Sequence, residues 1–117
     1  MTVPSVVRSA PVEVAKSDLV EAAYVAGKAV LTARTDSSRK EKGQFLTSPL
    51  IARNMASQLG PLPEGARVLD PAIGSGVLPC AVIEHATKTG FPKRLEIIGY
   101  EVDGELCDAA RAMLGSV

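Results

Sequence analysis

The sequence is poor in aromatic side chains and carries no net charge. It has no tryptophan, two tyrosines and two phenylalanines, so surfaces on which nucleic-acid bases could stack are scarce. Thirteen basic and thirteen acidic residues cancel, and a neutral chain has no overall field that attracts nucleic acid. Any affinity for DNA must therefore come from a local patch or from protein outside this sequence.

Histidine, cysteine and long apolar runs are scarce as well. The one histidine, His85, has no neighbouring pattern for metal binding or proton transfer and is expected on a helix surface. Cys80 and Cys107 lack the spacing of metal ligands, so reduced, packed thiols are expected. No run approaches the roughly 18 apolar residues of a membrane span. The first residues lack the order of a signal peptide, which favours a cytoplasmic protein. No catalytic residue and no metal ligand is predicted.

The length and composition indicate one domain. An apolar content of 46% over 117 residues is typical of a globular chain. Residues 1–16 contain two prolines and no steady apolar period, which predicts a mobile N-terminal arm. The domain is expected to span residues 17–117.

The most informative stretch is residues 67–76, with the sequence RVLDPAIGSG. Its short apolar run predicts a strand that ends at Asp70. Gly74 and Gly76 allow the backbone to turn sharply and to approach a ligand closely. Apolar residues then recur with helical spacing over 77–89, so the loop opens a helix whose first N–H groups are free. The whole run favours a ligand-binding loop of an α/β nucleotide-type unit, and an ordinary tight turn is the alternative.

Asp70 distinguishes between ligands for this loop. Its carboxylate would repel a pyrophosphate, and the loop lacks both the third glycine of a dinucleotide motif and the Gly-Lys-Ser/Thr of a P-loop. S-adenosylmethionine suits the loop better, because its ammonium can face Asp70 and its carboxylate can face the loop amides. The pattern therefore favours S-adenosylmethionine over NAD or FAD.

Two helices are expected before this loop, over residues 18–34 and 49–59. Apolar residues of the first recur at intervals of three and four, with Asp18 as its N-cap and a stripe made mostly of alanine. Ser48 and Pro49 open the second, and Gly60 ends it. Gly43, Gln44 and Thr47 supply groups that suit a carboxylate at a helix N-terminus, although capping alone explains the spacing. The most basic cluster lies in the intervening loop: Arg39, Lys40 and Lys42. It is either solvated surface or a contact to phosphates.

A second strand and a last helix follow the glycine loop. Residues 95–102 are strongly apolar at their centre, and strand, helix and strand imply a right-handed parallel crossover. Glu101 then lies at the carboxyl end of the second strand, beside the glycine loop, where such folds place an acid that binds two ribose hydroxyls. Val102 is expected to lie against an adenine ring as an apolar platform. Asp103 is the expected N-cap of a helix over 104–114.

Three segments together resemble the adenine-specific DNA methyltransferases of restriction-modification systems. GQFLTSPLIARNMA is similar to the family's N-terminal cofactor motif, VLDPAIGSGVL to its glycine loop, and IIGYEVD to its acidic motif. The resemblance implies the N-terminal part of a Rossmann-like, S-adenosylmethionine-dependent fold with an incomplete sheet. It also implies cofactor-binding roles: Thr47 and the Phe45 backbone at the methionine end, Asp70, Ala72, Gly74 and Gly76 as its cradle, and Glu101 at the ribose.

The family's catalytic segment, Asn-Pro-Pro-Tyr/Phe, has no counterpart here, because the sequence contains no Asn-Pro dipeptide. Its polar groups hold the flipped adenine and its ring stacks on the base. We therefore expect this chain to supply cofactor binding and to be inactive alone, with DNA bound through the rest of the enzyme or a partner subunit. Unpaired sheet edges predict self-association or completion by another chain. A non-catalytic assembly module and a methyltransferase for another substrate are the alternatives.

Overall fold

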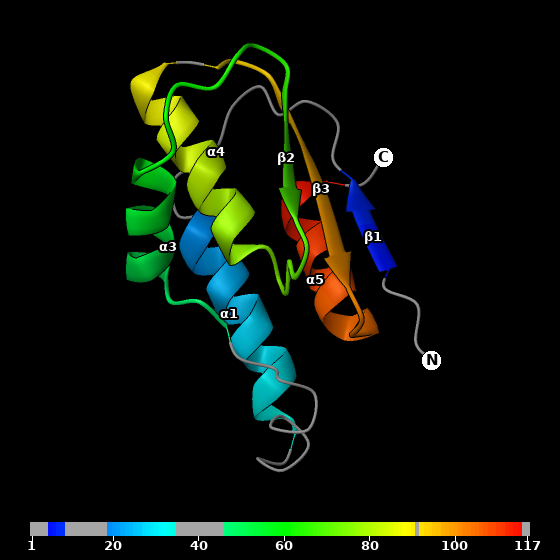
Figure 1. Ribbon diagram of the computed structural model, residues 1–117. Helices are drawn as coiled ribbons and strands as arrows, with labels where there is room; N and C mark the ends of the chain where they lie inside the picture. The colour runs from blue at the N-terminus through cyan, green and yellow to red at the C-terminus, as the bar shows by residue number, and fades with distance from the viewer. Residues whose placement is uncertain (1–4, 9–18, 35–45, 91, 116–117) are drawn as a thin grey trace.

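The computed structural model describes residues 5–8, 19–34, 46–90 and 92–115 (Figure 1). Helices and strands are mixed along these ranges, which confirms the α/β class. In chain order the elements are β1 (Ser5–Arg8), α1 (Leu19–Thr32), α3 (Pro49–Ser57), β2 (Ala66–Asp70), α4 (Val77–Thr89), β3 (Leu95–Glu101) and α5 (Gly104–Leu114). Every strand and helix predicted from the sequence is present, with ends that agree within three residues.

The described strands form one sheet in the order β1-β3-β2. β2 and β3 are parallel, from Ala66 opposite Leu95 to Asp70 opposite Gly99, and α4 is the crossover between them. This pairing was expected, because a parallel neighbour needs a long connection and a helix is the usual one. Asp70 and the end of β3 consequently lie at the same edge of the sheet.

β1 corrects the expectation that residues 1–16 have no regular structure. It pairs antiparallel with β3, from Ser5 opposite Glu101 to Arg8 opposite Ile98. The strand has four residues, and its partner lies far along the chain, so no local pattern of apolar residues or turns marks it. The remainder of residues 1–16 lies outside the described ranges.

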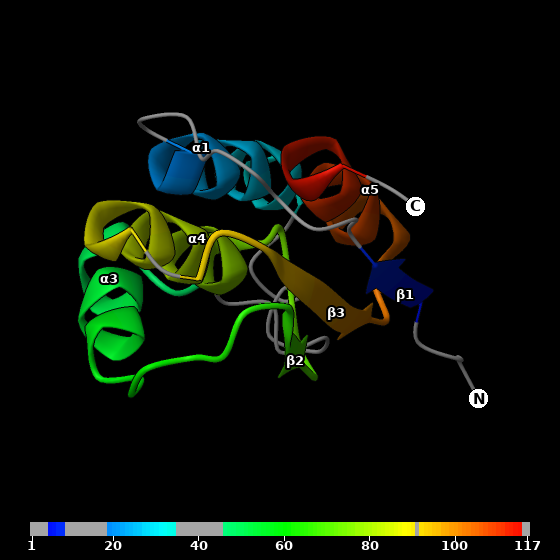
Figure 2. The same cartoon turned by 90° about the horizontal axis from the view of Figure 1, so that it is seen from above.

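The helices lie on one side of the sheet (Figure 2). Alternate residues of β3 face them, and the core forms in between. Its largest fully buried side chains include Ile97 of β3, Val20 of α1, Cys80 of α4 and Cys107 of α5. The two cysteines are free thiols in this interior, as the sequence predicted.

α1 buries a different face from the one its alanines indicated. The buried residues are Val20, Ala23, Gly27 and Leu31, whereas of the expected stripe at positions 19, 22, 23, 26, 29, 30 and 33 only Ala23 is buried. Alanines occur on several faces of this helix, and small side chains carry too little amphipathic signal to mark the packed one. Its expected N-cap, Asp18, lies outside the described residues.

α3 begins as predicted. The hydroxyl oxygen of Ser48 accepts a hydrogen bond from the Ile51 N–H at 3.4 Å, and Pro49 occupies the first helical position. The helix ends at Ser57 with Gln58 as its C-cap, before the expected stop at Gly60. Ser48 therefore fixes where the chain turns from the preceding motif into the helix.

Much of the apolar surface of α3 is exposed. Ala52 and Ala56 are buried, but the larger apolar side chains nearby are not: Leu50, Ile51, Met55 and Leu59. Leu69 of β2 is also exposed, at 61%, and β2 is an edge strand among the described residues. Among the described residues, β2 is therefore not paired on its outer side. Within the described ranges, no helix is both long and apolar enough to cross a membrane.

Gly99 allows the glycine loop to lie directly on β3. A Cβ at this position would be 2.7 Å from the Cβ of Ile73 and 2.9 Å from its Cγ1. Gly99→Ala is therefore expected to lower the free energy of unfolding by about 1–3 kcal/mol, because the loop must shift. Urea denaturation measures the change. Gly60→Ala is the matched control, since a Cβ there meets nothing within 4 Å, and equal losses in both variants would contradict the close approach.

Candidate functional site

The loop between β2 and α4 presents the N-terminus of a helix. Gly74 has φ 57° and Gly76 has φ 94°, a left-handed conformation that glycine adopts without strain. Gly76 is the N-cap of α4 and supplies no side-chain hydrogen bond to it. A helix N-terminus with free amides and a favourable dipole accommodates an anionic group.

Glu101 joins this loop to the turn after β3. One carboxylate oxygen, Oε1, accepts a hydrogen bond from the Gly74 N–H at 2.9 Å, and Oε2 accepts one from the Asp103 N–H at 2.8 Å. The two predicted motifs therefore meet through a single half-buried carboxylate. Each oxygen retains acceptor capacity, so the group can receive further hydrogen bonds while its position is fixed by two backbone amides.

Asp70 lies at the end of β2, opposite Gly99 of β3. Its Oδ1 accepts a hydrogen bond from the Ala72 N–H at 3.0 Å. Burial raises the pKa of the Asp70 carboxyl above its usual value, and the bond from Ala72 offsets only part of the effect. Among the described residues no Lys or Arg forms an ion pair with it. Asp70 is thus a partly desolvated carboxylate to which a ligand's cation would be attracted.

The segment before α3 reaches the glycine loop through Leu46. A Cβ at Gly74 would lie 3.5 Å from Leu46 Cδ2, and one at Gly27 would lie 2.6 Å from Leu46 Cδ1. Thr47 follows directly and is half-buried. The N-terminal motif and the glycine loop are therefore neighbours, as their assignment to one site requires. Phe45 lies outside the described residues.

Ser75 points away from the loop's open side and into the protein. It is fully buried, and its hydroxyl donates to the backbone oxygen of Ala23 in α1 at 2.7 Å. Gly27 lies against it, because a Cβ there would be 2.9 Å from Ser75 Cβ. The middle residue of Gly-Ser-Gly therefore anchors the loop to α1 and is not available to a ligand.

The remaining residues predicted for the site are exposed, serve as a helix cap or lie outside the described ranges. Val102 is 53% exposed, directly after Glu101, and Ala72 is exposed on the loop. Asp103 is the N-cap of α5, where its Oδ1 accepts from the Leu106 N–H at 3.0 Å; this role is confirmed. The basic cluster over residues 39–42 lies outside the described ranges.

A family model described as N-6 DNA methylase matches residues 16–113. The chain belongs to the N-6 DNA methylase family. The matched range contains the segment before α3, the glycine loop and the acidic turn, so the resemblance inferred from these motifs is confirmed. No curated protein and no solved structure gives a significant match.

Cys80 is not placed to act as a nucleophile. It lies on α4, fully buried, and burial raises the pKa of its thiol to about 12. A thiol reacts as its thiolate, so Cys80 is inert near neutral pH, in keeping with the packed thiol that the sequence predicted. Within the described ranges, no three His, Cys, Asp or Glu side chains cluster as a metal site needs.

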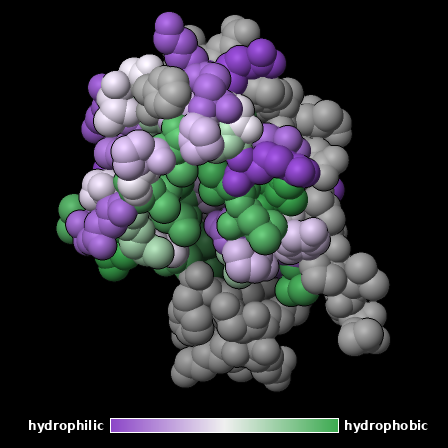
Figure 3. All heavy atoms as spheres, turned by 45° about the horizontal axis from the view of Figure 1, so that its top comes forward, coloured by the Kyte–Doolittle hydropathy of each residue, from purple (hydrophilic) through white to green (hydrophobic). Residues whose placement is uncertain are grey.

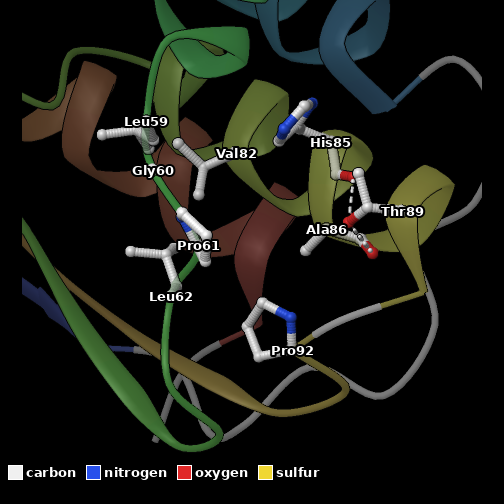
Figure 4. A pocket seen from close by; sticks show the side chains of 9 residues that line it. All are labelled: Leu59, Gly60, Pro61, Leu62, Val82, His85, Ala86, Thr89 and Pro92. Atoms are coloured by element: carbon white, nitrogen blue, oxygen red, sulfur yellow. Dashed lines mark hydrogen bonds between the residues drawn. The ribbon is translucent and has the colours of Figure 1, made fainter.

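A cavity of about 310 Å³ lies at the far end of α4 from the glycine loop (Figure 4). It is lined by Leu59, Gly60, Pro61, Leu62, Val82, His85, Ala86, Thr89 and Pro92. Figure 3, turned toward this end of the molecule, shows hydrophobic atoms in a hollow framed by hydrophilic ones. His85 lines this cavity on the surface of α4 and is half-buried. Thr89 uses its hydroxyl within the helix, donating to the backbone oxygens of His85 and Ala86.

Sequence reasoning missed four residues that shape the site: Leu46, Gly27 and Ser75, and also Arg34, whose guanidinium donates to the Asp103 carboxylate. Each acts through a contact to a residue far along the chain. The one local signal was Gly27, whose place inside a helix suggests a close approach. The partner of that approach, the glycine loop, could not be read from the helix itself.

Proposed function

We propose that this chain binds S-adenosylmethionine in the glycine loop. It would be the cofactor-binding part of an enzyme that methylates the exocyclic N6 amine of adenine in DNA, with a Rossmann-like fold. The observation that carries the proposal is the Glu101 carboxylate, held between the Gly74 and Asp103 amides. This contact brings together the glycine loop and the acid that a nucleoside cofactor requires at adjacent strand ends. Family membership supports the same assignment.

The residues present suit S-adenosylmethionine better than a dinucleotide. Asp70, desolvated and without an ion-pair partner among the described residues, would pair with the ligand's ammonium. The uncapped N-terminus of α4 would receive the carboxylate. When bound, the cofactor supplies a methyl group on a sulfonium.

Glu101 would accept hydrogen bonds from the ribose hydroxyls, and exposed Val102 would lie against the adenine. From the family resemblance, Thr47 and the Phe45 backbone would contact the methionine end. Ala72 and Gly76 would complete the cradle. These assignments place the ligand along the carboxyl ends of β2 and β3, where open parallel sheets bind ligands.

DNA is the proposed substrate, and the group that holds adenine would come from outside these residues. The sequence has no Asn-Pro dipeptide, so the remainder of the enzyme or a partner subunit would present the base. Arg39, Lys40 and Lys42 are the candidates for phosphate contact in this chain. Reading the gene beyond residue 117 for an Asn-Pro-Pro-Tyr/Phe segment tests this arrangement directly.

A second candidate function is a non-catalytic assembly module. The exposed apolar residues of α3 and the open edge of β2 favour it, because such surfaces pair with another chain or a further segment. Self-association, or completion by another polypeptide, is compatible with both candidates. Cofactor binding distinguishes them, since an assembly module requires none. A methyltransferase for another substrate would bind the same cofactor and would differ in methyl acceptor.

Isothermal titration with S-adenosylmethionine and with NAD tests the proposal. S-adenosylmethionine is expected to bind saturably, whereas NAD is expected to give no binding heat, because Asp70 repels its pyrophosphate. Equal binding of NAD would contradict the assigned role of Asp70. Absence of binding by either ligand would favour the assembly module.

A further inference from the structure

Arg34 makes a two-pronged contact with the turn that follows β3. It lies just beyond the end of α1, and its Nη1 and Nη2 donate to Asp103 Oδ2 and Oδ1 at 2.6 and 3.1 Å. The Arg34 side chain is 14% exposed and that of Asp103 is 4% exposed. This hydrogen bonding raises the pKa of Arg34 above its usual value. A charge-assisted, bidentate pair of this kind fixes orientation as well as distance.

The pair of Arg34 and Asp103 is linked by one hydrogen bond to Glu101, the residue proposed to bind the ribose. Asp103 donates its backbone N–H to Glu101 Oε2, and Glu101 Oε1 accepts from the Gly74 N–H. The Asp103 carboxylate meanwhile caps α5 through the Leu106 N–H. The Arg34 guanidinium, which is 69 residues from Asp103 in sequence, thus fixes the residue whose backbone N–H donates to Glu101.

α1 therefore reaches the site at two points. Near its middle, the Ala23 backbone oxygen accepts from Ser75 of the glycine loop at 2.7 Å. Just past its end, Arg34 binds Asp103 beside the acidic motif. Glu105 also accepts from Arg34, at 3.2 Å, but its side chain is 72% exposed, so solvent weakens that contribution. The buried partner, Asp103, is the one that fixes the turn.

We propose that Arg34 is a positioning residue that orients Glu101 toward the ribose of the cofactor, acting through Asp103. This inference rests on the proposed cofactor site. It means that the α1 segment helps to fix the geometry of that site. Arg34 touches no reacting group; it sets where the acidic turn lies relative to the glycine loop. Its loss should therefore affect recognition of the ribose more than recognition of the methionine end.

The test compares affinities for S-adenosylhomocysteine and its 2′-deoxyribose analogue, measured by isothermal titration. Wild type is expected to prefer the ribose ligand by about tenfold, since a hydrogen bond to a carboxylate is lost in the analogue. Arg34→Met should reduce this preference to near unity. Asp103→Asn should do the same while keeping the α5 cap, because asparagine caps as well as aspartate.

Arg53→Met is the matched control. Arg53 pairs with Glu21 and Glu84, so its removal also breaks ion pairs between helices, but these lie away from the acidic turn. The ribose preference should be unchanged in this variant. Circular dichroism melting of each variant verifies folding, and Asp103→Asn decides the matter if Arg34→Met does not fold.

Two results would overturn the inference in distinguishable ways. If wild type binds and prefers the ribose ligand, and the Arg34 and Asp103 variants retain that preference, the positioning role is wrong while the cofactor site stands. A uniform loss of affinity for both ligands, with the preference intact, would likewise indicate a purely structural role. If wild type binds neither ligand, the proposed function itself fails and the inference fails with it.

Discussion

Glu101→Gln is expected to lower the affinity for S-adenosylmethionine by about a hundredfold. Glutamine keeps one acceptor oxygen but loses the negative charge that strengthens both hydrogen bonds from the ribose hydroxyls, which accounts for a loss of this size. Glutamine also places an NH2 group against either the Gly74 or the Asp103 amide. An NH2 group cannot accept a hydrogen bond from an N–H, so one of the two bonds from the backbone is lost. The variant should therefore also melt at a lower temperature than wild type.

Isothermal titration and thermal melting measure these two effects. Glu96→Gln is the matched control, because it makes the same change on the same strand at the end away from the glycine loop. Glu96 pairs with Arg67 at 3.6 Å, and the Arg67 side chain is 64% exposed, so little stability is lost with it. Wild-type affinity in Glu101→Gln would remove this residue from the site.

Asp70→Asn is expected to weaken cofactor binding by at least about tenfold and to raise stability at neutral pH. The lost ion pair with the ligand's ammonium explains the first effect. The second follows from burial, which raises the pKa of Asp70 in the folded state. A carboxyl with a raised pKa contributes stability below its unfolded pKa, and this contribution is lost as pH rises through the folded pKa. At neutral pH the ionised group is therefore a cost that asparagine removes.

The difference in stability between Asp70→Asn and wild type should depend on pH. The gain in the free energy of unfolding from asparagine should be absent below pH 3.8, the ordinary pKa of the carboxyl, and complete above its raised pKa in the folded state. Denaturant unfolding over this range measures it. Asp108→Asn serves as the control, since that side chain is 79% exposed. A neutral-pH stability lower than wild type in Asp70→Asn, with affinity intact, would mean that Asp70 has a structural role.

Glu101→Gln and Asp70→Asn are expected to have opposite effects on stability, because the two carboxylates are held differently. Glu101 is held by backbone amides, and its replacement loses those bonds. Asp70 is partly desolvated without a cationic partner among the described residues, and its replacement relieves that cost. Groups kept at such a cost are typical of functional sites, where stability and activity conflict.

Local chemistry explains which elements the sequence predicted well. Ser48 with Pro49, Asp103 as a cap, and the glycines of the loop each determine backbone structure within a few residues of themselves. The same holds for the strand ends at Asp70 and Glu101. Their meeting at one edge of the sheet followed from the parallel crossover alone.

Long-range pairing explains what the sequence did not reveal. β1 is defined by a partner 90 to 96 residues later, and the contact of Ser75 with Ala23 spans 52 residues. Arg34 stands in no motif, because its role depends on how α1 packs against α5. Such contacts are decided by tertiary packing, on which propensity and periodicity carry no information.

An amide NMR correlation spectrum, recorded while S-adenosylhomocysteine is added to the 117-residue chain, tests the cofactor site most directly. The spectrum itself reports whether the chain is folded. We expect saturable shifts at Gly74, Gly76, Glu101 and Val102, with little change around His85 at the distant cavity. A well-dispersed spectrum that stays unchanged at millimolar ligand, or shifts confined to the cavity, would contradict a cofactor site in the glycine loop.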